Sequence, residues 1–224
     1  MPSTVVHMAV AGLIGAALLG TAFDRRSVLI LFGAMIAADL DSFVGLVSVV
    51  GHRTAFHTLL VPITATVVLL VDLRRGAGSW VRRRWGPRGV RITWVTIVAY
   101  AGAAIGLDLF SAGGANPLWP LHDQFYVIDG KIELSSRRGI VQTFVDLGSE
   151  RGGDASSSET VARGTSRDVN VSTGIDPNPD GGDTAGPVDR VFPVVRSGWQ
   201  LLVLVVGTTV TGARFYVDQA VPAE

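Results

Sequence analysis

The chain has no cysteine, and only one of its 19 basic residues is a lysine. The absence of cysteine excludes disulfide bonds and thiolate metal ligands. Charged residues make up 17% of the sequence, well below the roughly 25% of typical soluble domains. The formal net charge is zero, so no overall electrostatic field favours nucleic acid as a partner. These absences indicate a membrane protein and exclude a nucleic-acid-binding domain.

Long hydrophobic runs take the place of charge. Hydrophobic residues make up 48% of the chain, and the mean hydropathy is +0.40. Five segments approach the roughly 20 apolar residues that a helix needs to cross a bilayer. We therefore predict an all-α membrane protein with about five transmembrane helices. The predicted spans are 5–23, 27–46, 57–73, 92–110 and 198–217.

The arginines predict an orientation for these spans. Seven arginines fall within 74–91, between the third and fourth spans, and Arg25 and Arg26 lie between the first and second. Cytoplasmic loops carry the excess of basic residues, so both loops are predicted to be cytoplasmic. We therefore predict a multi-pass protein of the plasma membrane, with the amino terminus outside and the carboxyl terminus inside.

Composition divides the chain into four predicted regions. They are a four-helix transmembrane core (1–111), an external loop (112–148), a disordered acidic linker (149–197) and a final transmembrane helix with a short tail (198–224). The external loop contains the alternating stretch "QFYVIDGKIEL", in which Asp129 and Gly130 predict the turn of a small β-hairpin. The linker is predicted to be disordered because its central part is polar, acidic and poor in large apolar residues.

Four ionisable side chains fall at a similar depth in the predicted spans. Counted from the cytoplasmic end at 1.5 Å per residue, His7, His57 and Asp108 each lie about 25 Å along their helices, and Asp39 about 20 Å. Each is costly in hydrocarbon, by about 2.5–3.5 kcal/mol. Imidazole and carboxylate groups bind Zn, Mn and non-haem Fe. We predict that these four side chains bind a divalent metal, of the Zn, Mn or Fe kind, in the outer third of the membrane.

Three further residues lie slightly outside that level, on the connection between the second and third spans. We predict catalytic roles for them: Asp41 or His52 would orient a metal ligand or act as general base. The planar fork of Arg53 would bind an anionic group. Taken singly, each residue is also consistent with an interfacial or helix-end position without chemistry.

Four stretches carry a resemblance to a known family: "VVHMAVAG", "AADLDSF", "GHRTAFHTLL" and "GLDLFSAGGANPLWPL". Over about residues 4–145 the chain resembles the predicted membrane-bound metal-dependent hydrolases, typified by a LexA-regulated bacterial inner-membrane protein. The family shows an early His, an Asp-x-Asp pair, a His-Arg-x-x-x-His element followed by Ser or Thr, and a Leu-Asp before a turn that ends in Trp-Pro. The matching positions are His7, Asp39, Asp41, His52, Arg53, His57, Thr58, Asp108, Trp119 and Pro120.

The chain departs from the family pattern at two positions. Ala38 stands where the family usually has proline, and Ala104 where it often has histidine. His122, just after the Trp-Pro pair, is a potential replacement for that histidine, and a loop histidine without this role is the other interpretation.

The resemblance and the predicted metal ligands favour a membrane-embedded metal-dependent hydrolase. Its substrate would be a lipid-like molecule or phosphoester near the outer face, and its partners would be membrane lipids. A transporter or proton-relay protein is one alternative, because buried His and Asp also line ion pathways. The lack of an internal repeat argues against it. A non-catalytic membrane scaffold with a structural or lost metal site is the other alternative.

Overall fold

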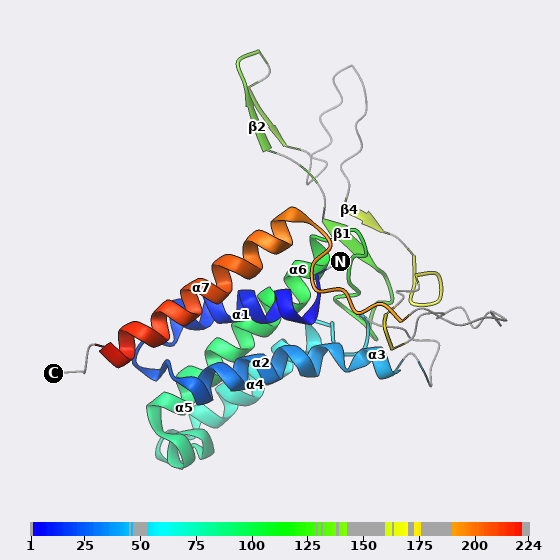
Figure 1. Cartoon of the computed structure of the whole chain (residues 1–224). Coiled ribbons are helices and arrows are strands. Elements are labelled where there is room, and N and C mark those ends of the chain that lie inside the picture. Colours follow the sequence, from blue (N-terminus) through cyan, green and yellow to red (C-terminus); the bar gives the residue numbers. More distant parts are fainter. Residues whose placement is uncertain are drawn as a thin grey trace.

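A computed structural model shows a mostly helical protein with its short strands gathered at one end of a helical bundle (Figure 1). The start of α1 lies at the same end as the strands, and the end of α7 lies at the opposite end. The structure describes residues 2–44, 46, 53–128, 130, 132–137, 139–142, 160–162, 164–169, 173–175 and 190–220.

Five long helical segments coincide with the five predicted spans. They are α1 (Thr4–Leu18), α2 (Arg25–Asp39), α4 (Leu60–Arg74), the continuous run of α5 (Trp80–Ala99), η3 (Tyr100–Gly106) and α6 (Leu107–Leu109), and α7 (Gly198–Ala220). Three short helices accompany them: η1 (Gly20–Ala22), α3 (Asp41–Val44) and η2 (Gly76–Gly78).

Only two of these segments are long and apolar enough to cross a membrane, judged within the part of the chain that the structure describes: Trp80–Leu109 and Gly198–Ala220. The prediction of about five spanning helices is therefore not supported as it stood. Helices α1, α2 and α4 have 15 residues each. At the rise of an α-helix this gives about 22 Å, short of the roughly 30 Å hydrocarbon layer.

Side-chain caps fix where α1 and α2 begin, and the shortening relative to the predicted spans falls at their carboxyl ends, at Leu18 and Asp39. The Ser3 side chain accepts a hydrogen bond from the backbone N–H of Val6, and the Asp24 side chain accepts one from Ser27 at 2.8 Å. Side-chain oxygens at these positions satisfy N–H groups that the helix leaves free and so fix where it begins. Helix α2 ends at Asp39, and α3 begins at Asp41.

The long segment that ends in Asp108 is irregular at two places. Gly86 has a φ of +66° and precedes Pro87, so α5 is kinked there. The seven residues of η3 form a π-helix immediately before α6. Wider π-helical turns often occur at functional sites, and this one precedes a predicted metal ligand.

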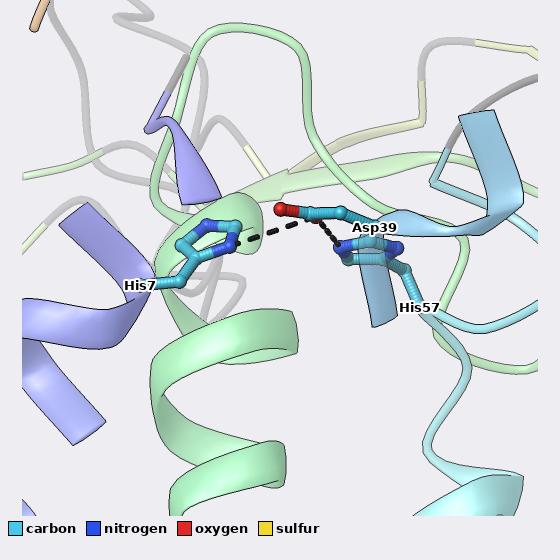
Figure 2. A group of neighbouring side chains, drawn as sticks. All are labelled: His7, Asp39 and His57. Carbon is cyan, nitrogen blue, oxygen red and sulfur yellow. Dashed lines mark ion pairs between the residues drawn. The ribbon is translucent and has the colours of Figure 1, made fainter. Parts of the chain in front are cut away.

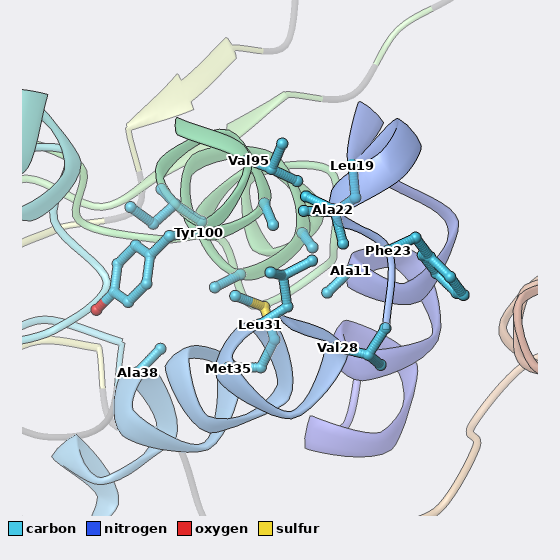
Figure 3. Close-up of a cluster of buried hydrophobic side chains, with 14 residues drawn as sticks. Ala11, Leu19, Ala22, Phe23, Val28, Leu31, Met35, Ala38, Val95 and Tyr100 are labelled. Atoms are coloured by element: carbon cyan, nitrogen blue, oxygen red, sulfur yellow. The ribbon is translucent and has the colours of Figure 1, made fainter. Parts of the chain in front are cut away.

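The hydrophobic core lies between α1, α2 and the α5–η3 segment (Figure 3). Small residues let these helices approach closely, and Leu31 and Met35 of α2 fill the space between them. The cluster consists of Ala11, Leu19, Ala22, Phe23, Val28, Leu31, Met35, Ala38, Val95, Ala99, Tyr100, Ala103, Ala104 and Ile105. Ala38 and Ala104, the two departures from the family pattern, are thus core residues.

Glycine and threonine mediate the contact between α1 and α7. A Cβ atom added at Gly207 would lie 2.6 Å from the carbonyl oxygen of Ala9, and one at Gly12 would lie 2.5 Å from Oγ1 of Thr211. Small residues of this kind allow close packing of helices in membranes. The final helix is therefore packed directly on the helix that carries His7.

This contact gives a prediction with a matched control on the same helix. Gly207→Ala should lower stability by roughly 1–3 kcal/mol, the usual cost of overpacking, because the new methyl group collides with α1 backbone. Nothing lies within 4 Å of a Cβ atom at Gly212, so Gly212→Ala should be neutral or slightly stabilising. Thermal unfolding in mild detergent measures both, and equal effects would contradict the close α1–α7 contact.

The predicted hairpin differs from the one that forms. Strands β1 (Tyr126–Ile128) and β2 (Ile132–Ser135) flank the Asp129-Gly130 pair, but they do not pair with each other. Strand β2 pairs with β3 (Gly139–Gln142), and β1 pairs with β4 (Thr160–Ala162). The turn therefore follows β2, where Gly139 has a φ of +70°. A local turn signal cannot reveal a partner strand more than 30 residues away.

Part of the predicted linker is ordered, which corrects that prediction for the residues concerned. Strand β4 lies within it, and Ser166 donates hydrogen bonds to Asp123 from its backbone N–H at 2.9 Å and its hydroxyl at 2.7 Å. Burial alone would raise the pKa of Asp123, but the hydrogen bonds from Ser166 and Asn116 outweigh it and hold the pKa below its usual value. Most of the predicted linker falls outside the described residues.

Candidate metal centre

Four side chains from four separate elements converge beside the first turn of α1. His7 comes from α1, Asp39 from the end of α2, His57 from the segment before α4, and Asp108 from α6. In Figure 2 the imidazole rings of His7 and His57 lie on either side of the Asp39 carboxylate. These are the four predicted ligands, and the structure brings all of them together.

The distances between them fall in a narrow range. Nδ1 of His7 lies 3.8 Å and Nε2 of His57 3.4 Å from Oδ1 of Asp39. Nε2 of His7 lies 3.5 Å from Oδ1 of Asp108, and Nε2 of His57 lies 3.5 Å from Oδ2 of Asp108. These separations are longer than the roughly 2.7–3.2 Å of an ordinary hydrogen bond.

Such spacing matches ligands that share an ion. Zinc binds nitrogen and oxygen at about 2.0–2.2 Å, so two ligands of one tetrahedral ion lie roughly 3.4 Å apart. One set of ligand atoms from His7, Asp39 and His57 lies within 4.8 Å of one another. Both ring nitrogens of His7, Oδ1 of Asp39 and Oδ2 of Asp108 are buried without a hydrogen-bond partner among the described residues. Burial of unsatisfied polar atoms is costly, and coordination would satisfy them, so the residues present fit a divalent metal.

Asp41 lies behind His57 and fixes its ring. Its Oδ2 atom lies 2.8 Å from Nδ1 of His57 and accepts a hydrogen bond from the backbone N–H of Arg53 at 3.1 Å. This leaves Nε2 of His57 directed toward Asp39 and Asp108. A carboxylate on the far nitrogen sets the tautomer and orientation of a metal-binding histidine, which is the orienting role predicted for Asp41.

Arg53 does not occupy the place predicted for it. Its side chain is fully buried, and Nη2 donates to Oδ1 of Asp108 at 2.5 Å. Nη1 donates to Ser111 at 3.0 Å and to the carbonyl of Gly114 at 2.8 Å. The guanidinium is thus committed to the protein and holds Asp108 in place. Arg53 lies in a loop and has a φ of +72°. The sequence carries no signal that the side chain of such a loop arginine points into the protein.

Two contributors to the centre were missed by the sequence analysis. The hydroxyl of Thr4 donates to Oδ2 of Asp39, and the hydroxyl of Tyr100 donates to the carbonyl of Phe56 at 2.6 Å, next to His57. The position of Thr4 three residues before His7 places both on one face of α1, which is a signal that could have found it. Tyr100 had none, because its partner is a backbone group from a distant loop.

Of the two remaining histidines, the structure describes only His122, and it does not join this group. His52 lies outside the described residues, so its predicted role stays a prediction. His122 is exposed, and its Nε2 atom lies 3.0 Å from the hydroxyl of Tyr126. It does not replace the family histidine at position 104, where Ala104 is buried in the core.

Exposure distinguishes Asp39 from the other three candidate ligands. Its side chain is 16% exposed, whereas those of His7, His57 and Asp108 are 2% exposed or less. A solvent or ligand molecule can therefore approach the centre on the Asp39 side, and the other three sides are covered by protein.

Comparison with known proteins agrees with this architecture. The model of one family, the YdjM inner membrane protein, matches residues 1–153, which include His7, Asp39, His57 and Asp108. Searches of curated proteins and of solved structures give no match. The family match covers more than half of the chain. One of the two helices able to cross a membrane by length and composition, Trp80–Leu109, lies inside the matched region, and the other, Gly198–Ala220, lies beyond it. The chain belongs to the YdjM inner membrane protein family.

Proposed function

We propose that the protein is a membrane-embedded metal-dependent hydrolase that acts on a lipid-like or phosphoester substrate. One observation carries the proposal: His7, Asp39, His57 and Asp108 converge at distances that suit ligands of one ion. Among the described residues, both ring nitrogens of His7, Oδ1 of Asp39 and Oδ2 of Asp108 are buried there without a hydrogen-bond partner. A Zn, Mn or Fe ion bound there would supply Lewis acidity, acidifying a water molecule and polarising a scissile ester. If the centre binds a metal but catalyses no reaction, the protein is instead a membrane scaffold with a structural metal site.

The chain's own residues divide the remaining work. Asp41 holds the His57 ring in one tautomer through the 2.8 Å contact at Nδ1. Arg53 compensates the buried charge of Asp108 and keeps its carboxylate in position. Asp39, at the open side, is oriented by the hydroxyl of Thr4. Such supporting contacts hold a site in its working geometry before the substrate arrives.

We also propose that α1, α2 and α4 lie within the membrane beside the two longer helices. Large apolar side chains are exposed along α2, α4 and α7, including Leu29, Val68 and Leu202 at 66%, 62% and 63%. An apolar surface of this extent suits lipid better than water. Fifteen-residue helices are accommodated by local thinning of the bilayer.

In this arrangement the arginine-rich stretch 74–91, which includes the first part of α5 up to and just past its kink at Gly86, faces the cytoplasm, and the candidate metal centre faces outward. Single cysteines at Ala77 and at Thr173 report the orientation in intact cells. A membrane-impermeant thiol reagent should label the cysteine at 173 and leave the one at 77 unlabelled. The reverse labelling would discard the orientation.

Hydrolysis itself is tested with purified protein in mild detergent. The substrates are a phosphomonoester, a phosphodiester and a carboxylate ester of p-nitrophenol, together with short-chain phosphatidate. We expect turnover of at least one phosphoester, loss of turnover on chelation and in His57→Ala, and recovery in wild type with Zn or Mn. Metal-loaded wild type that hydrolyses none of these would refute the hydrolase, and turnover that survives both chelation and His57→Ala would refute metal-dependent hydrolysis at this centre.

A further inference from the structure

A cavity of about 330 Å³ opens beside the exposed side of Asp39. It is lined by the start of α1, by Asp39 and Ser42, and by the segments 173–175 and 192–196, which together are called the wall below. Its volume lies near the lower end of the roughly 300–1,000 Å³ typical of ligand pockets. The cavity is thus large enough for the head group of an amphiphile but not for the whole molecule.

The wall is held against α1 by specific contacts. The Ser3 hydroxyl donates to the carbonyl of Val194 at 2.5 Å. Nη1 of Arg190 donates to the carbonyls of Gly174 and Ile175 at 3.2 and 2.8 Å, which joins the two wall segments. Figure 1 shows the orange segment before α7 running past the amino terminus, at the end of the bundle that carries α3. Hydrogen bonds therefore fix the wall to α1 and join its two segments.

Arg196 is the cation of this cavity. Its side chain lines the cavity and is exposed, and no carboxylate forms an ion pair with it among the residues that the structure describes. Its backbone N–H donates to Oε1 of Gln200 at 2.8 Å, and Gln200 is buried. The backbone of Arg196 is therefore fixed while its guanidinium remains available to a ligand.

The other lining residues favour a ligand with an apolar part. Val5, Ile175, Phe192 and Val194 all face the cavity. Arg196 lies two residues before α7, a helix able to span a membrane, and the exposed Trp199 follows it. Tryptophans are enriched at the level of lipid head groups. A ligand with a charged head group at Arg196 and an apolar tail along the bundle would match both the apolar lining and the position of Arg196 at the start of α7.

We propose that this cavity binds the phosphate head group of an anionic amphiphile, with Arg196 pairing with the phosphate next to Asp39. The inference rests on the proposed function, because it names the substrate class of the same centre. Guanidinium and phosphate form a bidentate, charge-assisted pair. This gives Arg196 the anion-binding role that the buried position of Arg53 rules out for that residue.

Calorimetric titration of the full chain in mild detergent tests the proposal. The ligands are dihexanoyl phosphatidate, the uncharged dihexanoylglycerol and inorganic phosphate, each with zinc-loaded protein. Arg196→Gln should weaken phosphatidate binding by roughly ten- to a hundredfold, as expected for one lost charged hydrogen-bonding pair. Arg26→Gln, an exposed arginine at the other end of α2, should leave binding unchanged.

The other outcomes separate the two proposals. Equal binding of dihexanoylglycerol, or unchanged affinity in Arg196→Gln, would overturn the head-group site. Phosphate binding as tight as phosphatidate, with the same Arg196 dependence, would overturn the amphiphile and identify free phosphate as the ligand. Metal content is measured on each sample: normal zinc in Arg196→Gln with lost affinity supports the head-group site. Wild type that retains neither Zn, Mn nor Fe would refute the metal centre instead.

Discussion

Replacing either His57 or Asp39 by alanine should abolish metal binding. The two side chains come from different elements, and their facing atoms are 3.4 Å apart, so each supplies one ligand to a shared ion. Loss of one ligand leaves too few donors in the described set to hold the ion. It also leaves a poorly solvated carboxylate without its partner, at a cost on the order of 3–5 kcal/mol. Metal content after gel filtration and thermal unfolding in detergent measure the two effects.

Three comparisons make this prediction specific. The double variant His57→Ala/Asp39→Ala should lose no more metal than either single variant, because contributions from one site are not additive. Added zinc should raise the unfolding temperature of wild type by mass action but not that of His57→Ala. Asp41→Asn should keep the metal with affinity reduced by roughly ten- to a hundredfold, since Asp41 orients His57 and is not itself one of the proposed ligands. Full metal stoichiometry in both alanine variants would contradict the shared site.

Replacing Arg53 by methionine should be the most destabilising change outside the ligands. The guanidinium is fully buried, and it balances Asp108 through a 2.5 Å contact while also binding Ser111 and Gly114. Methionine fills a similar volume but leaves the Asp108 charge uncompensated, which typically costs about 3–5 kcal/mol. We expect a large fall in unfolding temperature or failure of the protein to accumulate in the membrane.

Arg53→Lys keeps the result interpretable if the methionine variant does not fold. Lysine retains the positive charge but lacks the fork that reaches three partners, so it should accumulate and unfold at an intermediate temperature. Arg26→Met, at an exposed position, controls for loss of an arginine in general. Unfolding of Arg53→Met at the wild-type temperature would show that Arg53 does not hold Asp108.

The convergence of His7, Asp39, His57 and Asp108 was predictable from the sequence because the rise of a helix is regular. Distances counted along separate helices translate directly into depth when the helices lie side by side in a bundle. The structure brings the same four side chains together, although α1, α2 and α4 are shorter than predicted and His57 lies just before α4.

The direction of loop side chains was not predictable in the same way. Arg53 precedes the apolar run of α4 and suggested an anion-binding residue on the connection between two spans, yet its side chain is fully buried against Asp108. The partner of β1 was also out of reach, because it lies beyond the second hairpin strand. Both outcomes depend on contacts between segments distant in sequence, for which periodicity and turn signals carry no information.

The metal content of the wild-type protein tests the central claim most directly. The full chain, purified in mild detergent, is equilibrated in separate samples with Zn, Mn and Fe, freed of loosely bound ions by gel filtration, and analysed by mass spectrometry of the elements. The account predicts about one tightly bound ion per chain of at least one of these metals, as expected for a single site of histidine and carboxylate ligands, and none in His57→Ala. Wild-type protein that retains no stoichiometric ion of any of the three would contradict it.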